Sequence, residues 1–249
     1  MAQAPLLQLS DISLTFGGEP VFANLSLIVQ PGDRVALVGR NGSGKSTLMK
    51  VMAGMVEPDT GTRVVPAGTS VGYMEQEPDL SGFETLGEYA AQGLGPAEMY
   101  LVEAAGEGLG FDPERPVATA SGGERRRAAL ARLMAQDPDV MLLDEPTNHL
   151  DLDTTLWLQT WLQAYRGTLL MISHDRDFID ATCERTLEIA RQALTAYRGG
   201  YSDYERQRAE QMAQQQAQYE KQQRRIADIE DFVRRFRAKA TKARQAQSR

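Results

Sequence analysis

A glycine-rich loop at residues 39–46 constrains the fold of this chain more than any other feature. Its sequence, GRNGSGKS, follows the short apolar run Arg34–Val38 and leads into a helix predicted over Ser46–Ala53. This matches the pattern G-x-x-x-x-G-K-[ST] in the strand-to-helix context that the pattern requires. The glycines let backbone N–H groups turn toward phosphate oxygens at the positive end of the helix. The predicted phosphate-binding residues are Gly39, Asn41, Gly42, Ser43, Gly44, Lys45, Ser46 and Thr47.

An acidic pair follows a second apolar run, Val140–Leu143, which we expect to be a buried strand. Asp144 then lies at the carboxyl end of that strand, where ligands bind in parallel sheets. In isolation, the pair also fits an ordinary acidic turn. Beside a phosphate loop, Asp144 is predicted to hold Mg²⁺ together with Ser46, and Glu145 to orient or deprotonate an attacking water. Lys45 is expected to bridge the terminal phosphates of a nucleoside triphosphate.

Strands alternating with helices predict an α/β fold with a mostly parallel sheet. Residues 77–119 have weaker periodicity and are predicted to form a small helical subdomain extending to about residue 135. Two early strands joined by a turn at residues 17–20 predict a β-subdomain. The predicted strands are Leu6–Phe16, Val21–Val29, Arg34–Val38, Val140–Leu143 and Thr168–Ile172, and the predicted helices include Glu84–Gln92, Ala97–Ala105 and Leu156–Tyr165.

The composition changes at Gly200. All 22 glycines and 11 prolines precede residue 201, so we divide the chain into a domain over 1–200 and a long helical extension over 201–249. The extension has apolar residues seven apart at Met212, Tyr219 and Ile226, which predicts a coiled-coil seam and a partner helix.

Charge is distributed unevenly along the chain. The formal net charge is −7, yet residues 204–249 carry 12 basic and 6 acidic side chains. The body is therefore acidic and the tail basic. Most often such a basic run is a solvated helix face, but its segregation favours contact with a phosphate backbone. The predicted RNA-contact residues are Arg234, Arg235, Arg237, Lys239, Lys242 and Arg244.

The single cysteine, Cys183, excludes a disulfide framework and a multi-cysteine metal site. No window approaches the roughly 20 apolar residues of a membrane span, and the start has no secretory leader pattern. We therefore expect a cytoplasmic chain without a membrane span.

The sequence Ser121-Gly122-Gly123-Glu124 opens a predicted helix. Ser121 and Glu124 form a capping-box pattern, which is a sufficient structural reason for both residues. Capping does not require the two glycines, which would let a phosphate approach the free helix amides closely.

Together these motifs resemble an ATP-binding-cassette (ABC) domain over residues 6–200. Ser121 precedes Asp144 by 23 residues and His174 follows Glu145 by 29, spacings that suit that superfamily. The resemblance implies that ATP and Mg²⁺ bind between two cassettes, with residues 121–124 facing the phosphate loop of the second one.

The same resemblance assigns four further residues by position. Phe16 is expected to stack on adenine, although a strand-end core residue is the alternative. Gln76 is expected to contact Mg²⁺ and the attacking water, and Asp151 to lie in the D-loop. His174 is expected to contact the γ-phosphate, and the alternative interpretation is that this histidine is purely structural.

Three features resemble the ABC-F class of ATP-binding-cassette proteins. They are the sequence EPTNHLD at residues 145–151, the S-G-G-E form of the signature and the charged helical tail. This implies an ATPase that acts on the ribosome, with a second cassette in the same full-length chain or in a homodimer. Without that second cassette, the chain is expected to be only weakly active. Ala120 departs from the usual leucine, and the short spacing after Gln76 implies that a longer helical arm is missing. We expect the chain to be a fragment ending within the linker. The alternatives are an ATPase subunit of a membrane transporter and a DNA-associated ABC protein.

Overall fold

A computed structural model describes residues 4–247, with side chains described for all of these except residues 96, 227–228 and 230–247. The chain divides by its internal contacts into two units, Met1–Tyr204 and Glu205–Arg249. The predicted boundary at Gly200 lies close to this division, and the functional division of the chain remains a prediction.

An antiparallel sheet forms the predicted β-subdomain. Its strand order is β2-β1-β4, and β1 pairs with both neighbours, Leu7 with Val29 and Gln8 with Val64. The buried residues of β1 are Leu7 and Leu9 and, after a shift in the pairing register, Ile12 and Leu14, as expected for a sheet with one solvated face. The strands are β1 (Leu7–Thr15), β2 (Pro20–Val29) and β4 (Thr60–Val64).

A six-stranded sheet forms the centre of the first unit, in the order β5-β6-β7-β3-β8-β9. All its pairings are parallel except that of β8 with β9. Every residue of β6 and β7 is buried, which explains their continuous apolar sequences. The strands are β3 (Arg34–Gly39), β5 (Val71–Met74), β6 (Val140–Asp144), β7 (Thr168–Ile172), β8 (Arg185–Ala190) and β9 (Ala193–Arg198).

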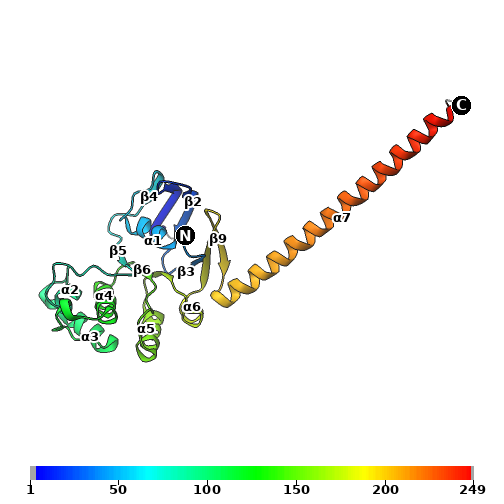
Figure 1. Cartoon of the computed structure of the whole chain (residues 1–249). Helices are drawn as coiled ribbons and strands as arrows, with labels where there is room; N and C mark the ends of the chain where they lie inside the picture. Colours follow the sequence, from blue (N-terminus) through cyan, green and yellow to red (C-terminus); the bar gives the residue numbers. More distant parts are fainter. Residues whose placement is uncertain (1–3, 248–249) are drawn as a thin grey trace. The chain divides into compact units, whose positions relative to one another are not determined.

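Helices cover this sheet and form a separate group beside it. Figure 1 shows α2, α3 and α4 together at one end of the first unit, where the helical subdomain was predicted. Two 3₁₀ turns, η1 (Pro96–Glu98) and η2 (Val117–Thr119), connect them. The helices are α1 (Lys45–Ala53), α2 (Leu86–Ala90), α3 (Met99–Leu109), α4 (Gly122–Gln136), α5 (Leu152–Ala164) and α6 (Arg176–Thr182).

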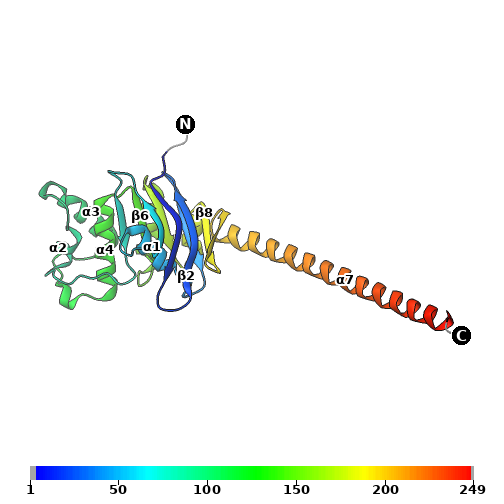
Figure 2. The same ribbon diagram turned by 90° about the horizontal axis from the view of Figure 1, so that it is seen from above.

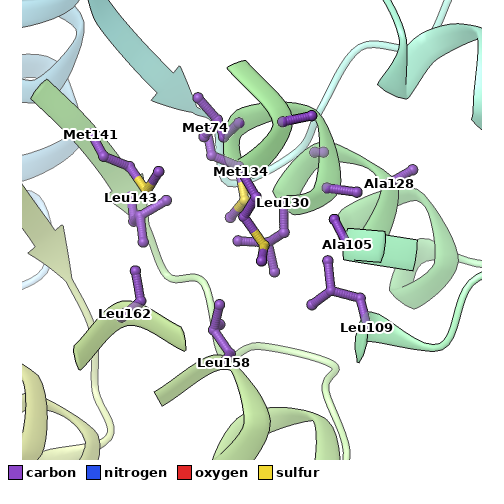
Figure 3. Close-up of a cluster of buried hydrophobic side chains, with 14 of the residues drawn as sticks. Met74, Ala105, Leu109, Ala128, Leu130, Met134, Met141, Leu143, Leu158 and Leu162 are labelled. Carbon is purple, nitrogen blue, oxygen red and sulfur yellow. The ribbon is translucent and has the colours of Figure 1, made fainter. Parts of the chain in front are cut away.

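Two hydrophobic cores lie on opposite faces of the six-stranded sheet. In one, α1 packs with β1, β2 and the sheet residues Val35, Leu37 and Leu142; Figure 2 shows α1 beside these strands. In the other, Leu130 of α4 packs with Leu143 of β6 and with α5 (Figure 3). Each large apolar side chain fully buried in this way contributes about 1.5–3 kcal/mol. The fold is the predicted α/β cassette fold, with a mixed sheet and an antiparallel subdomain.

One helix, α7 (Tyr201–Gln247), occupies the end of the chain. Within the first unit its initial turn is anchored, because the Ser202 N–H donates to Asp180 Oδ1 at 3.0 Å and the Tyr204 hydroxyl to Glu188 Oε1 at 3.0 Å. In the second unit, Met212 and Tyr219 of the predicted seam are exposed. The coiled coil remains a prediction.

Across residues 4–247, none of the helices has the length and apolarity needed to span a bilayer.

Candidate nucleotide-binding site

The predicted phosphate loop connects β3 to α1 with three glycines at positive φ. Gly39, Gly42 and Gly44 have φ angles of 156°, 79° and 92°. At Gly44 the packing is as restrictive as the backbone, because a Cβ there would lie 2.4 Å from Val21 Cγ1. Glycine is therefore required at this point both for the turn into α1 and for the approach of β2.

The positive end of α1 is open to an anion. Gly44, the residue that precedes the helix, makes no side-chain cap, and the first turn has no acidic residue. Lys45 Nζ donates to the carbonyls of Gly39 at 3.0 Å and Arg40 at 3.2 Å, so its ammonium lies across its own loop. Burial lowers the pKa of Lys45, while Glu145 and Asp144 act in the opposite direction. The loop thus combines free helix amides with a cation, as phosphate binding requires.

Asp144 ends β6 and is 1% exposed. The Tyr73 hydroxyl lies 3.5 Å from Oδ2, and burial followed by the charge of Asp144 raises the pKa of Tyr73. The other oxygen, Oδ1, is buried without a hydrogen-bond partner in the described structure. Such an orphaned carboxylate oxygen needs a ligand, and oxygen donors are those that Mg²⁺ prefers. The Asp144 carboxylate therefore fits a ligand of a magnesium ion, and the role of the Ser46 hydroxyl remains a prediction.

Glu145 is held in an unusual position directly after Asp144. Its φ is 53°, in the left-handed region that non-glycine residues rarely adopt, and its backbone N–H donates to Ile172 O at 2.9 Å. The residue is 5% exposed. Burial raises the pKa of its carboxyl, an effect that His174 opposes. A buried carboxylate of raised pKa beside a phosphate loop is suited to accept a proton.

His174 is the nearest partner of this carboxylate in the described structure. Its backbone N–H donates to Glu145 Oε2 at 3.3 Å, and Nε2 lies 3.4 Å from Oε1. The imidazole side chain is 69% exposed, so it is not a buried structural residue. The structure therefore brings Lys45, Asp144, Glu145 and His174 to the same edge of the sheet, at the carboxyl ends of β3, β6 and β7.

The predicted signature begins α4 with a complete capping box. Ser121 Oγ accepts from the Glu124 N–H at 3.3 Å, and the Ser121 N–H and hydroxyl both donate to Glu124 Oε2 at 2.8 Å. Arg115 also pairs with Glu124, at 3.6 Å. Ser121 and Gly122 are exposed, so a second molecule has access to these residues.

Phe16, Gln76 and Asp151 lie in three different environments. Phe16 is 63% exposed between β1 and β2, so its interpretation as a core residue is wrong. Gln76 is exposed just after β5. Asp151 caps α5 by accepting from the Thr154 N–H at 2.8 Å, which lowers its pKa. The predicted contacts of these residues with nucleotide remain predictions.

The predicted RNA-contact side chains, residues 234, 235, 237, 239, 242 and 244, lie outside the side chains that the structure describes. Their backbone belongs to α7.

Sequence reasoning missed Arg126, which is 3% exposed. Its guanidinium donates to Asn148 O at 3.1 Å and to the carbonyl of Gln76. A signal was present: Arg126, Leu130 and Met134 recur every four residues on the buried face of α4. An arginine on such an apolar face indicates buried partners.

The fold and the loops at the carboxyl edge of its sheet place the chain in the class of ATP-binding cassettes. Two family models, both described as ABC transporter, match residues 22–148 and 187–249. The chain belongs to the ABC-F family of ATP-binding-cassette proteins.

Two curated relatives show the extent of the similarity. The probable ATP-binding protein YheS of Escherichia coli K12 is 38% identical over 98% of this chain and 44% of its own length. The energy-dependent translational throttle protein EttA of Mycobacterium tuberculosis H37Rv is 33% identical over 94% of this chain and 48% of its own. The chain thus spans less than half the length of these relatives.

Solved structures share the fold at lower identity. The ATP-binding subunit of an ABC transporter has a TM-score of 0.72 at 23% identity, covering 82% of this chain and 93% of that one. A dimeric post-hydrolysis state of the ATP-binding cassette MJ0796, bound to ADP and Pi, has a TM-score of 0.67 at 19% identity, covering 77% and 98%.

Proposed function

We propose that this chain binds and hydrolyses ATP between paired cassettes, and that the resulting closure acts on the ribosome. The observation that carries the proposal is the position of Glu145. Its buried carboxyl has a raised pKa, follows an orphaned Asp144 oxygen directly and faces His174. An ordinary acidic turn after a strand would not require a buried carboxylate that faces a histidine of the next strand's loop.

Hydrolysis follows from the roles that these residues can take. The amides of the phosphate loop and Lys45 hold the terminal phosphates, replacing the loop carbonyls to which Lys45 now donates. Glu145 orients the attacking water and accepts its proton. His174 keeps the carboxylate directed toward the same edge and contacts the γ-phosphate. Ser46, Asp144 and Gln76 would hold Mg²⁺, which would neutralise phosphate charge when bound.

A second cassette completes the site in this proposal. The signature residues Ser121–Glu124 lie at the start of α4, whereas the phosphate loop lies at the start of α1, and the signature is open to a partner. The dimeric state of the similar cassette MJ0796 supports a paired arrangement. The partner is either a second cassette of a longer chain or another copy of this one.

The ribosomal part of the proposal rests on one relative and on charge. EttA is by name a translational throttle protein, and the basic residues of α7 offer phosphate contacts without base specificity. Such contacts weaken steeply as salt rises.

Ribosome pelleting with ATP tests this proposal. Wild type and Glu145→Gln are sedimented with ribosomes in ATP, ADP and high salt, and ATP hydrolysis is measured in parallel. We expect ATP-dependent pelleting that is stronger for Glu145→Gln and lost at high salt. Lys45→Ala is the control and should not respond to ATP. Two results would count against a ribosomal role. One is pelleting that is the same with ATP, with ADP and without nucleotide, and the other is competition by duplex DNA that is as strong as competition by ribosomal RNA.

A further inference from the structure

The guanidinium of Arg126 joins two loops of the candidate site that are far apart in sequence. One is the segment after β5, where the carbonyl of Gln76 accepts one of its N–H groups. The other is the turn after Glu145, where the carbonyl of Asn148 accepts a second at 3.1 Å. One buried side chain thus sets the distance between the Gln76 backbone and the turn that begins at Glu145.

Two backbone hydrogen bonds lie within the second loop, between Glu145 and the start of α5. Within it, the Asn148 N–H donates to Glu145 O at 3.3 Å, and the Leu150 N–H to Thr147 O at 3.2 Å. These overlapping turns connect Glu145 to Asp151, the cap of α5. Fixing Asn148 O therefore restrains both ends of the turn.

The electrostatic surroundings support a role beyond packing. Burial lowers the pKa of Arg126, while Glu145, Asp144 and Glu77 act in the opposite direction. A buried cation is costly to desolvate, and apolar residues often replace such groups without loss of stability. The planar guanidinium of arginine has several N–H donors, however, and can therefore donate to two carbonyls at once.

We propose that Arg126 is a positioning residue for ATP hydrolysis, holding Gln76 and Glu145 in one relative arrangement. α4 also begins at the signature Ser121, so one helix carries both the signature and this guanidinium. This inference rests on the proposed function of the site.

Arg126→Lys and Arg126→Met separate positioning from charge and from folding. Lysine keeps the positive charge but lacks the planar guanidinium. Methionine keeps an apolar side chain of similar length and removes the charge. The control is Arg132→Lys on the same helix, whose guanidinium lies 5.0 Å from the Tyr89 ring centroid in the helical subdomain. For each variant we would measure steady-state ATP hydrolysis, the thermal midpoint and ATP affinity. The affinity is measured in a Glu145→Gln background.

We expect both Arg126 variants to lower kcat by about tenfold to a hundredfold, since small misplacements of reacting groups have effects of this size. KM and ATP affinity should change less than about threefold, and Arg132→Lys should match wild type. If methionine prevents folding, lysine alone decides the question. The inference would be overturned if Arg126→Lys had the kcat of wild type. It would also be overturned if kcat and ATP affinity fell in parallel with the thermal midpoint. No hydrolysis by wild type with its second cassette present would instead overturn the proposed function, and this inference with it.

Discussion

Both carboxylate oxygens of Glu145 face His174: Oε2 accepts from the histidine backbone N–H at 3.3 Å, and Oε1 lies 3.4 Å from Nε2. The two residues follow neighbouring parallel strands, β6 and β7, so the register of the sheet itself brings them together. The orientation of the carboxylate is therefore set by a loop other than its own.

Glu145→Gln should retain ATP binding and lose hydrolysis. Glutamine preserves the shape of the side chain and can still accept from the His174 N–H, but it cannot accept a proton from water. We expect kcat to fall by about 10²-fold or more, with ATP affinity within about threefold. Phosphate release and fluorescent-nucleotide titration measure the two quantities. Undiminished hydrolysis would remove Glu145 from the mechanism.

Burial of Glu145 makes its contribution to stability depend on pH. Desolvation raises the pKa of the carboxyl above its ordinary value of 4.5 in the folded chain. A group whose folded pKa is raised stabilises the fold fully below the unfolded pKa, and this contribution is lost as pH rises through the folded value. Glutamine does not titrate.

The thermal midpoint of Glu145→Gln relative to wild type should therefore increase as pH is raised from about 4.5 to about 8. Scanning calorimetry across this range measures the difference. A midpoint difference that does not vary with pH would show that Glu145 ionises as easily in the folded chain as in the unfolded one.

The sequence motifs predicted the nucleotide-site loops well because each motif is local. The glycine positions of the phosphate loop and the capping box at Ser121 depend on a few neighbouring residues, and the structure shows both geometries. The parallel sheet was likewise predictable from the continuous apolar runs of β6 and β7.

Long-range pairings were not predictable in the same way. Strand β4 reads TGTRV and has no apolar alternation, so only its pairing with β1 defines it. The order of β7 and β8 on either side of β3 is set by packing between segments distant in sequence. The partners of Arg126 could not be predicted for the same reason, since they lie 22 and 50 residues away.

Lys45→Ala should weaken nucleotide binding itself. In the described structure the ammonium bonds to two carbonyls of its own loop, so it is already placed over the phosphate-binding segment. Removing it deletes the main cation of the loop, and we expect ATP affinity to fall about tenfold or more. Isothermal titration calorimetry with MgATP measures this. ATP affinity equal to wild type would show that Lys45 does not reach the phosphates.

Gly44→Ala should destabilise the fold more than Gly42→Ala does. Both glycines have positive φ, which costs an alanine about 1–2 kcal/mol. Only at Gly44 would the new Cβ also collide with neighbours, at 2.4 Å from Val21 Cγ1 and 2.9 Å from Phe22 Cε1, which adds about 1–3 kcal/mol of overpacking. A Cβ added at Gly42 would meet no atom within 4 Å apart from those of its two chain neighbours.

Urea unfolding of the two alanine variants provides the comparison. We expect the free energy of unfolding to be lower for Gly44→Ala than for Gly42→Ala by about 1–3 kcal/mol, which is the overpacking term alone. Equal losses would mean that β2 moves away without cost and that the packing around Gly44 is loose.

Ser121 has two roles to separate, the cap of α4 and the proposed contact with ATP on a second cassette. Ser121→Ala removes the cap and should cost about 1 kcal/mol of stability as well as hydrolysis. Ser121→Asn keeps a good capping residue but replaces the small hydroxyl with a larger amide at the open helix end. We therefore expect the asparagine variant to recover the thermal midpoint of wild type without recovering ATP hydrolysis. If hydrolysis returned together with stability, capping alone would explain Ser121.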